Sequence, residues 1–335
     1  MSHIGVITNP TAGSGRGARW GAEALTALSA RGHHIRDLSR GTWAASYEAA
    51  IKHRRGLDAL VVVGGDGMVH LGIQVCGGRK LPLGIVAAGS GNDAAISLGL
   101  PIHDIDASAG RIDDGLAGHV TRVDLGQITG HTVDHPGKPR YFIAVLSAGI
   151  DAAIAAYAAN LRHPRGSLKY KVATLRELPR FKPYGVRIVV DGTEWTGRCT
   201  LVAVANGAVF GGGLMISPDS RMTDGKLELV LAEPLSRPAI VKLFPKLYDG
   251  SHLADSRIRV IQATSIEISQ HGHKGGRGHE SRQGHKGRHD EGRGDPSIGA
   301  LLPPAFADGE LVGRAPLTVT VAPLALRVLG ATPRN

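Results

Sequence analysis

Two apolar runs, each ending in a glycine-rich loop, constrain the fold of this 335-residue chain more than any other feature. Leu60–Val63 is followed by Gly-Gly-Asp-Gly at 64–67, and Leu83–Ala87 is soon followed by Gly-Ser-Gly-Asn-Asp at 89–93. Each run is long enough for a buried strand and too short for a helix, and apolar residues at near-helical spacing resume after each loop. The sequence therefore predicts two parallel strands that each enter a helix through a glycine-rich turn.

The composition of these loops suits a phosphorylated ligand. Glycine lets the backbone adopt positive φ and approach a ligand closely, and free N–H groups at a helix start attract phosphate oxygens. In open α/β sheets, ligands bind beyond the carboxyl ends of the strands. Asp66 alone would repel phosphate, so it makes chemical sense if it addresses Mg²⁺ or an attacking hydroxyl. Tight turns without a ligand are the alternative, but two acidic glycine loops favour the functional interpretation.

A third glycine-rich loop follows the first predicted strand, His3–Thr8, and runs from Asn9 to Gly17. It lacks the Gly-Lys-Ser/Thr of a Walker A loop, and its backbone and Arg16 either bind phosphate or simply turn the chain. Thr42 follows the second predicted strand, on the rim where a nucleotide would lie or in an ordinary loop. Predicted strands alternate with predicted helices here, which indicates a doubly wound parallel sheet.

The two acidic loops, taken together and in this order, resemble the diacylglycerol kinase catalytic domain family, which includes sphingosine kinases and bacterial lipid kinases. Ser90 stands where these kinases commonly carry threonine, and the more distant NAD kinases and phosphofructokinases share the first motif. The resemblance implies an α/β N-terminal domain with a mostly parallel, doubly wound sheet and a β-rich, β-sandwich-like C-terminal domain. It also implies a set of ATP-binding residues. These are Asn9, Gly13, Gly15, Arg16, Thr42, Gly64, Gly65, Asp66, Gly67, Ser90 and Asn92.

The pattern changes from alternating strands and helices to mostly strands after Asp124. We therefore expect a nucleotide-binding domain over residues 1–124 and a lipid-substrate domain over 125–325. Residues 326–335 would form a tail, with a return to the first domain as one option. The His/Gly/Arg-rich segment 270–297 is expected to be a disordered loop.

Several elements of the second domain can be predicted individually. Tyr141–Ala148 and Leu317–Val321 are predicted strands, Pro238–Asp249 is a predicted helix, and residues 210–213 form a glycine-rich loop of mobile character. Asp308-Gly309-Glu310 resembles a family motif whose glutamate is catalytic, and Glu310 is predicted to lie in a loop before a strand.

The resemblance gives roles to further acidic positions. Asp151, in Gly-x-Asp-Ala, resembles the position that contacts lipid headgroup hydroxyls. Asp124 would have a catalytic role near the metal, or it is a strand-end carboxylate in a turn. Asp224 resembles a ligand of a structural Mg²⁺, completed by the backbone carbonyls of Arg221 and Lys226; hard oxygen ligands suit that ion. An ordinary type I turn fits Asp224 about as well.

The net charge of +10 suits anionic lipid, nucleic acid or nucleotide phosphates. Aromatic residues make up only 4% of the chain, which disfavours a base-stacking nucleic-acid binder. Two distant cysteines fit a reducing compartment. We see no signal peptide and no apolar run long enough to span a bilayer, so a cytoplasmic enzyme acting on lipid must visit the inner face of the membrane. A homodimer is an open alternative to a monomer.

The predicted function is ATP- and Mg²⁺-dependent phosphorylation of a lipid hydroxyl, with diacylglycerol converted to phosphatidic acid. Asp66 and Glu310 would face each other across a cleft, and either one could be the base. A long-chain base such as sphingosine, or NAD, is an alternative acceptor on the same scaffold. A nucleotide- or lipid-binding regulatory protein is the non-enzymatic alternative.

Overall fold

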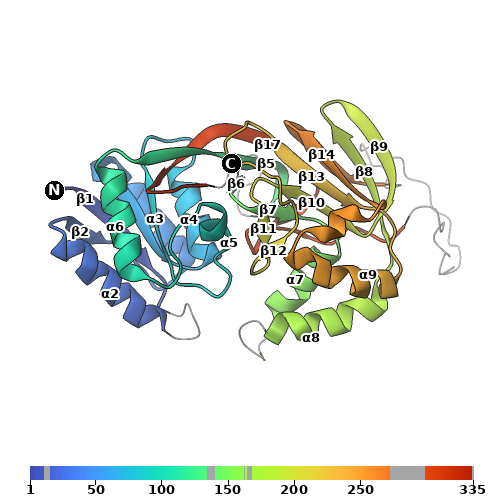
Figure 1. Ribbon diagram of the computed structural model, residues 1–335, viewed down its shortest axis with the longest axis horizontal. Helices are drawn as coiled ribbons and strands as arrows, with labels where there is room; N and C mark the ends of the chain where they lie inside the picture. Colours follow the sequence, from blue (N-terminus) through green and yellow to red (C-terminus); the bar gives the residue numbers. More distant parts are fainter. Residues whose placement is uncertain (11–15, 134–139, 162, 164–167, 272–298, 334–335) are drawn as a thin grey trace, which may run out of the picture.

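The computed structural model shows two lobes, an α/β lobe first and a β-rich lobe second (Figure 1). This arrangement confirms the predicted fold class. The structure describes residues 1–10, 16–133, 140–161, 163, 168–271 and 299–333. Gly13, Gly15 and almost all of the segment 270–297 therefore lie outside the described residues.

The first lobe contains a parallel sheet with helices on both faces. Its strands are β1 (His3–Thr8), β2 (His34–Asp37), β3 (Ala59–Gly64) and β4 (Leu83–Ala87), and its helices are α2 (Gly17–Ala30), α3 (Trp43–His53), α4 (Asp66–Cys76), α5 (Asp93–Ser97) and α6 (Ile105–Leu116). The strand order is β2-β1-β3-β4. α3, α4 and α5 pack on one face, and α2 and α6 on the other, as expected when strands alternate with helices.

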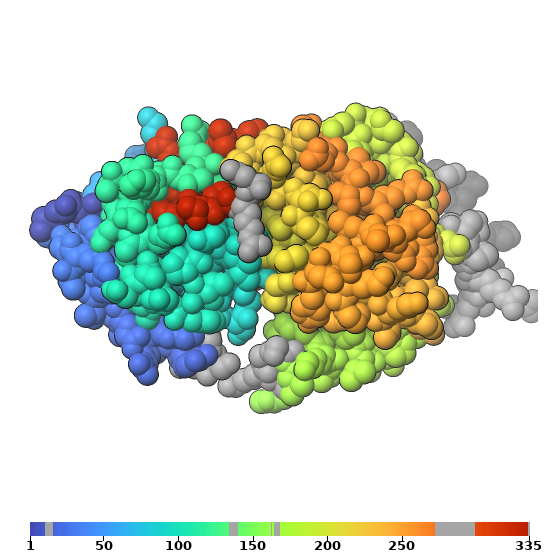
Figure 2. Space-filling view, in the orientation of Figure 1, coloured from blue at the N-terminus to red at the C-terminus, as the bar shows by residue number. Residues whose placement is uncertain are grey.

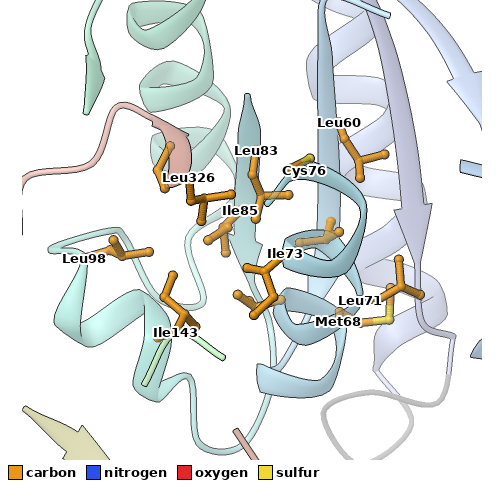
Figure 3. Packing of buried hydrophobic residues seen from close by; sticks show 14 of the residues in the cluster. Leu60, Met68, Leu71, Ile73, Cys76, Leu83, Ile85, Leu98, Ile143 and Leu326 are labelled. Carbon is orange, nitrogen blue, oxygen red and sulfur yellow. The ribbon is translucent and has the colours of Figure 1, made fainter. Parts of the chain in front are cut away.

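Helix α4 lies at the centre of the larger first-lobe core (Figure 3). Leu71 and Ile73 of this helix are buried in one cluster with Leu83 of β4. Ile143 and Leu326, from distant parts of the chain, enter the same cluster. Burial of each such side chain contributes about 1.5–3 kcal/mol, which holds the whole helix, including its first turn, in place.

The second lobe is a sandwich of antiparallel strands. Its strands are β5 (Val120–Thr132), β6 (Arg140–Phe142), β7 (Val145–Ser147), β8 (Tyr184–Val190), β9 (Thr193–Cys199), β10 (Leu201–Ala205), β11 (Val209–Phe210), β12 (Leu214–Met215), β13 (Leu227–Ala232), β14 (Ile258–Ala263), β15 (Ser265–Gln270), β16 (Ala305–Ala307) and β17 (Glu310–Leu329), and its helices are α7 (Ile150–Asn160), α8 (Leu168–Glu177) and α9 (Arg237–Leu243). The layer β14-β13-β10-β7-β16 packs on the layer β9-β8-β15, with one apolar cluster between them.

Strands β5 and β17 connect the two lobes (Figure 1). β17 begins in the sandwich beside β16, and near its end Val328 pairs in parallel with Leu83 of β4. Where the strands cross between the lobes, the buried Asp124 carboxylate accepts the N–H groups of Gly225 (2.7 Å) and Leu324 (2.6 Å). The C-terminal strand therefore returns to the first lobe.

Several predicted elements differ from the structure. The single strand expected at 141–148 is split into β6 and β7, because the amides of Ile143 and Ala144 bind the Asp308 carboxylate instead of a ladder partner. The helix expected at 238–249 ends at Leu243 and continues as a 3₁₀ helix that contains Pro245, which lacks the N–H an α-helix needs. Glu310 is the first residue of β17 rather than part of a preceding loop.

The glycine-rich loop at 210–213 is also more ordered than predicted. Its ends belong to the hairpin β11–β12, where Val209 pairs with Met215 and Phe210 with Leu214. The other helix and strand boundaries fall within a few residues of the predicted ones, with two exceptions. β17 extends well beyond both ends of the strand predicted at Leu317–Val321, and β5 extends well beyond the strand that the sequence predicts at His119–Leu125.

Candidate active site

The two glycine loops of the first lobe lie against each other at the carboxyl ends of β3 and β4. A side chain on Gly89 would overlap the backbone of Gly65. Asp66, at the start of α4, accepts the N–H groups of Asn92 (2.8 Å) and Ala94 (3.2 Å) across the gap. The Asp66 carboxylate therefore holds the second loop to the first.

Asn92 closes the second loop from within. It is buried, has a positive φ of 63°, and its side chain accepts from the amide of Gly89 (2.8 Å) and donates to the Gly89 carbonyl (3.1 Å). These bonds are structural, because they satisfy the loop's own backbone. Ser90 is exposed beside it.

Glu310 lies against the first turn of α4. A Cβ atom placed on Gly67 would be 2.7 Å from the Glu310 Oε1 atom. Similarly, a Cβ atom on Gly91 would be 2.7 Å from Asp66 Oδ2. A side chain at position 67 or 91 would therefore force the neighbouring carboxylate to shift. The structure brings Asp66 and Glu310 to the same turn of α4 although they belong to different lobes.

The turn that carries Glu310 is a two-residue hairpin formed by Asp308 and Gly309. Their φ angles are 52° and 82°, and Ala307 pairs with Glu310 across them. Asp-Gly is the favoured sequence for such a turn. The Asp308 side chain is 2% exposed and accepts from the amides of Ile143 (3.0 Å) and Ala144 (2.8 Å). The sequence indicated Glu310 but gave no sign that Asp308 positions it.

Asp93 is a second residue that sequence analysis did not assign to the site. Its carboxylate accepts the N–H groups of Gly212 (3.0 Å) and Gly213 (2.8 Å) from the β11–β12 hairpin. Figure 2 shows the teal surface of the first lobe and the yellow surface of the second lobe beside each other at the boundary between the lobes. The Gly-Ser-Gly-Asn-Asp loop therefore touches the second lobe directly.

Burial, with a smaller effect from neighbouring carboxylates, raises the pKa values of Asp66 and Asp93 at this boundary. Burial, followed by the negative charges of Asp93 and Asp308, raises the pKa of Asp66 from 3.8 to about 6. Burial also raises the pKa of Asp93, against the effect of its bonds to backbone amides. Burial, with smaller effects from Glu310 and Asp66, raises the pKa of Tyr170 on α8. This tyrosine, which sequence analysis missed, is therefore close enough to feel both carboxylates.

The other predicted nucleotide-binding residues follow first-lobe strands at the same edge of the sheet. Asn9 follows β1, and its backbone N–H donates to the Val63 carbonyl (3.2 Å). Thr42 caps α3 by accepting from Ala45 N–H (3.2 Å). Arg16 is exposed, and its guanidinium lies 4.7 Å from the centroid of the Trp20 ring. Their contact with a nucleotide stays a prediction.

Asp151 lies in the second lobe, at the start of α7. Its side chain is buried, and both carboxylate oxygens lack a hydrogen-bond partner among the described residues. Burial raises its pKa, against the opposite effect of the nearby Ser147 hydroxyl and backbone amides at the start of α7. Contact of this carboxylate with a lipid headgroup stays a prediction.

The remaining predicted acidic residues, Asp124 and Asp224, bind backbone amides. The Asp124 carboxylate accepts the N–H groups of Gly225 and Leu324, so it stabilises the crossing between the lobes. Asp224 lies in an exposed turn where its Oδ1 atom accepts from the amide of Lys226 (3.0 Å). In the described part of the chain, no three His, Cys, Asp or Glu side chains form a ready metal cage. Metal binding at Asp224 and the carbonyls of Arg221 and Lys226 stays a prediction.

Comparisons with known proteins agree with this fold. The diacylglycerol kinase catalytic domain matches residues 3–128, and the YegS C-terminal NAD kinase beta sandwich-like domain matches residues 144–284. The chain is 30% identical to a diacylglycerol kinase of Mycobacterium tuberculosis over 98% of this chain and 95% of that protein. It is 25% identical to a diacylglycerol kinase of Bacillus subtilis, with 80% and 86% covered.

A solved structure shows the same fold over nearly the whole chain. The crystal structure of a putative diacylglycerol kinase from Bacillus anthracis superposes with a TM-score of 0.69 at 20% identity, covering 99% of this chain and 97% of that one. The family match and the relatives over the whole length of the chain define the class of this protein, which is a kinase. The chain belongs to the diacylglycerol kinase catalytic domain family. No helix in the described residues is both long and apolar enough to cross a membrane.

Proposed function

We propose that this protein transfers the γ-phosphate of ATP to a lipid hydroxyl, with diacylglycerol as the acceptor and phosphatidic acid as the product. The observation that carries the proposal is the meeting of Asp66 and Glu310 at the first turn of α4. Phosphoryl transfer requires positioning and charge stabilisation more than covalent chemistry by the protein. Rigid loops and carboxylates from two lobes supply a place where donor and acceptor can be brought together.

In the proposed reaction, the acceptor oxygen forms a bond to the γ-phosphorus while the bond from that phosphorus to the bridging oxygen of ATP breaks. The acceptor hydroxyl loses its proton as the new bond forms. Asp66 or Glu310 takes that proton, and solvent removes it afterwards. With its pKa raised to about 6, Asp66 is a stronger base than an ordinary aspartate and is still ionised near neutral pH.

The residues at the lobe boundary fit Mg²⁺ that arrives with the nucleotide. Asp93 and Asp308 raise the pKa of Asp66, which means that negative charge is crowded there and a divalent cation would relieve it. Of Asp66 and Glu310, the carboxylate that does not take the proton would hold that ion. Bound Mg²⁺ neutralises charge on the transferred phosphoryl group.

Helix α8 is the proposed approach of the enzyme to the membrane surface. Leu168 is 52% exposed and Leu175 is 78% exposed, and Lys171 lies between them. Apolar side chains beside cations suit a surface of anionic lipid. Tyr170 of the same helix feels the two active-site carboxylates, so a lipid that binds here has a short path to them. In Figure 1, α8 lies below α7, whose first turn carries Asp151.

The test is transfer of radiolabel from [γ-³²P]ATP to a panel of acceptors in mixed micelles. The panel contains diacylglycerol, monoacylglycerol, sphingosine and ceramide, with NAD as a soluble acceptor. Label in phosphatidic acid that disappears in Asp66→Ala supports the proposal. Label found only in a phosphorylated long-chain base or in NADP would show that the acceptor is the long-chain base or NAD and not diacylglycerol. Binding of ATP without transfer to any acceptor would favour a regulatory protein.

A further inference from the structure

One face of helix α4 contacts the second lobe at three residues that are spaced along the helix. Gly67 meets Glu310, His70 meets Asp308, and Gln74 meets Tyr141. Residues three and four apart in a helix lie on the same face. The Gln74 side chain pairs with the Tyr141 backbone in both directions, donating to its carbonyl (2.8 Å) and accepting from its amide (3.0 Å).

His70 is the titratable residue among these three, and it is 0% exposed. Its Nδ1 atom lies 3.2 Å from Asp308 Oδ2. Arg140 donates from Nε to His70 Nε2 at 3.3 Å. Because a guanidinium only donates, Nε2 must carry the lone pair and Nδ1 must carry the hydrogen. The imidazole is therefore neutral and donates from Nδ1 to Asp308.

We infer that His70 is a positioning residue for Glu310 and acts through Asp308. Asp308 is the first residue of the two-residue turn that presents Glu310, and its carboxylate is already fixed to two backbone amides of the second lobe. The bond from His70 fixes the same carboxylate to α4, one turn beyond Asp66. This buried hydrogen bond therefore joins the helix that carries Asp66 directly to the turn that carries Glu310. This inference rests on the proposed function only where kinase activity is the readout.

The test uses three substitutions at position 70. The amide nitrogen of asparagine can occupy the place of Nδ1, the amide of glutamine reaches instead toward the place of Nε2, and leucine offers no donor. His70→Leu and His70→Gln are expected to lower kcat by about 10- to 100-fold, since a displacement near 1 Å costs that much, while KM for ATP changes by less than about twofold. His70→Asn is expected to stay within about threefold of the unmodified enzyme.

His33→Leu is the matched control. His33 also bonds to an aspartate, with Nε2 2.6 Å from Asp113 Oδ1, but it precedes β2 at the amino-terminal edge of the sheet. Its loss is expected to leave kcat unchanged whatever it does to stability. Equal impairment of His70→Asn and His70→Leu would overturn the inference, and so would a normal kcat in His70→Leu.

Amide hydrogen exchange separates this inference from the proposed function. His70→Leu is expected to speed exchange at Ile143 and Ala144, whose amides bind Asp308, by at least about tenfold, and His33→Leu is not. Absence of activity toward every acceptor in the unmodified protein would refute the proposed function and leave this readout standing. Unchanged exchange at both amides in His70→Leu would refute the role of His70.

Discussion

Replacing Asp66 by asparagine is expected to remove activity. It is also expected to raise the stability of the folded protein, relative to the unmodified protein, more at alkaline pH than at acidic pH. The folded state holds a proton on Asp66 up to about pH 6, because burial and two neighbouring aspartates raise its pKa from 3.8. The unfolded chain releases that proton at about the ordinary value. Between these two values the native state binds more protons, so stability falls as pH rises and the loss is complete above about pH 6.

The size of the effect follows from the two pKa values. One pKa unit corresponds to about 1.4 kcal/mol, so ionised Asp66 costs the folded state up to about 3 kcal/mol at high pH. At about pH 5 the same linkage gives roughly half of that cost, which leaves a difference of about 1 to 2 kcal/mol between about pH 5 and about pH 8. Asparagine also loses one of the two backbone bonds that Asp66 accepts, for about 1 kcal/mol, but that loss does not depend on pH.

Urea unfolding of both proteins at these two pH values measures the effect. The free energy of unfolding of Asp66→Asn minus that of the unmodified protein is expected to rise by about 1 to 2 kcal/mol from the lower to the higher pH. Asp219→Asn, which removes an exposed carboxylate, serves as the control and should show little change with pH. A pH-independent difference for Asp66→Asn would refute the view that burial and carboxylate crowding act on this residue.

Two further predictions concern the same site. Gly67→Ala should lower kcat by about 100-fold, because its Cβ would displace the Glu310 carboxylate. Gly110 is a helical glycine with open space around it, so the control Gly110→Ala should keep full activity and gain up to about 1 kcal/mol of stability. Steady-state kinetics and urea unfolding of both variants check these expectations. In the profile of kcat/KM against pH, the acidic limb should have its midpoint near the Asp66 pKa of about 6. Asp93→Asn should move this midpoint to lower pH, because it removes a neighbouring negative charge. A midpoint that does not move in Asp93→Asn would contradict the effect of the Asp93 charge on Asp66.

Local signals in the sequence predicted the fold and the motifs well. Strand β4 was predicted to the residue, since a short apolar run between turn residues has one simple interpretation. The Asp-Gly-Glu motif was found, but the pairing of Asp308 with the amides that split β6 from β7 is a long-range contact without a local signature. The bonds from Asp93 to the β11–β12 hairpin are hidden for the same reason. Sequence shows which groups are available, and only the packing of the lobes shows which of them meet.

The most direct test of the account is the rate of phosphoryl transfer from ATP to diacylglycerol in the Glu310→Gln variant. Glutamine keeps the size of the side chain beside Gly67 but cannot accept a proton or neutralise a cation. The account predicts that kcat falls by about 10²- to 10⁴-fold, while ATP binding measured by calorimetry is little changed. Transfer at an undiminished rate would contradict the claim that carboxylates from both lobes form one active site.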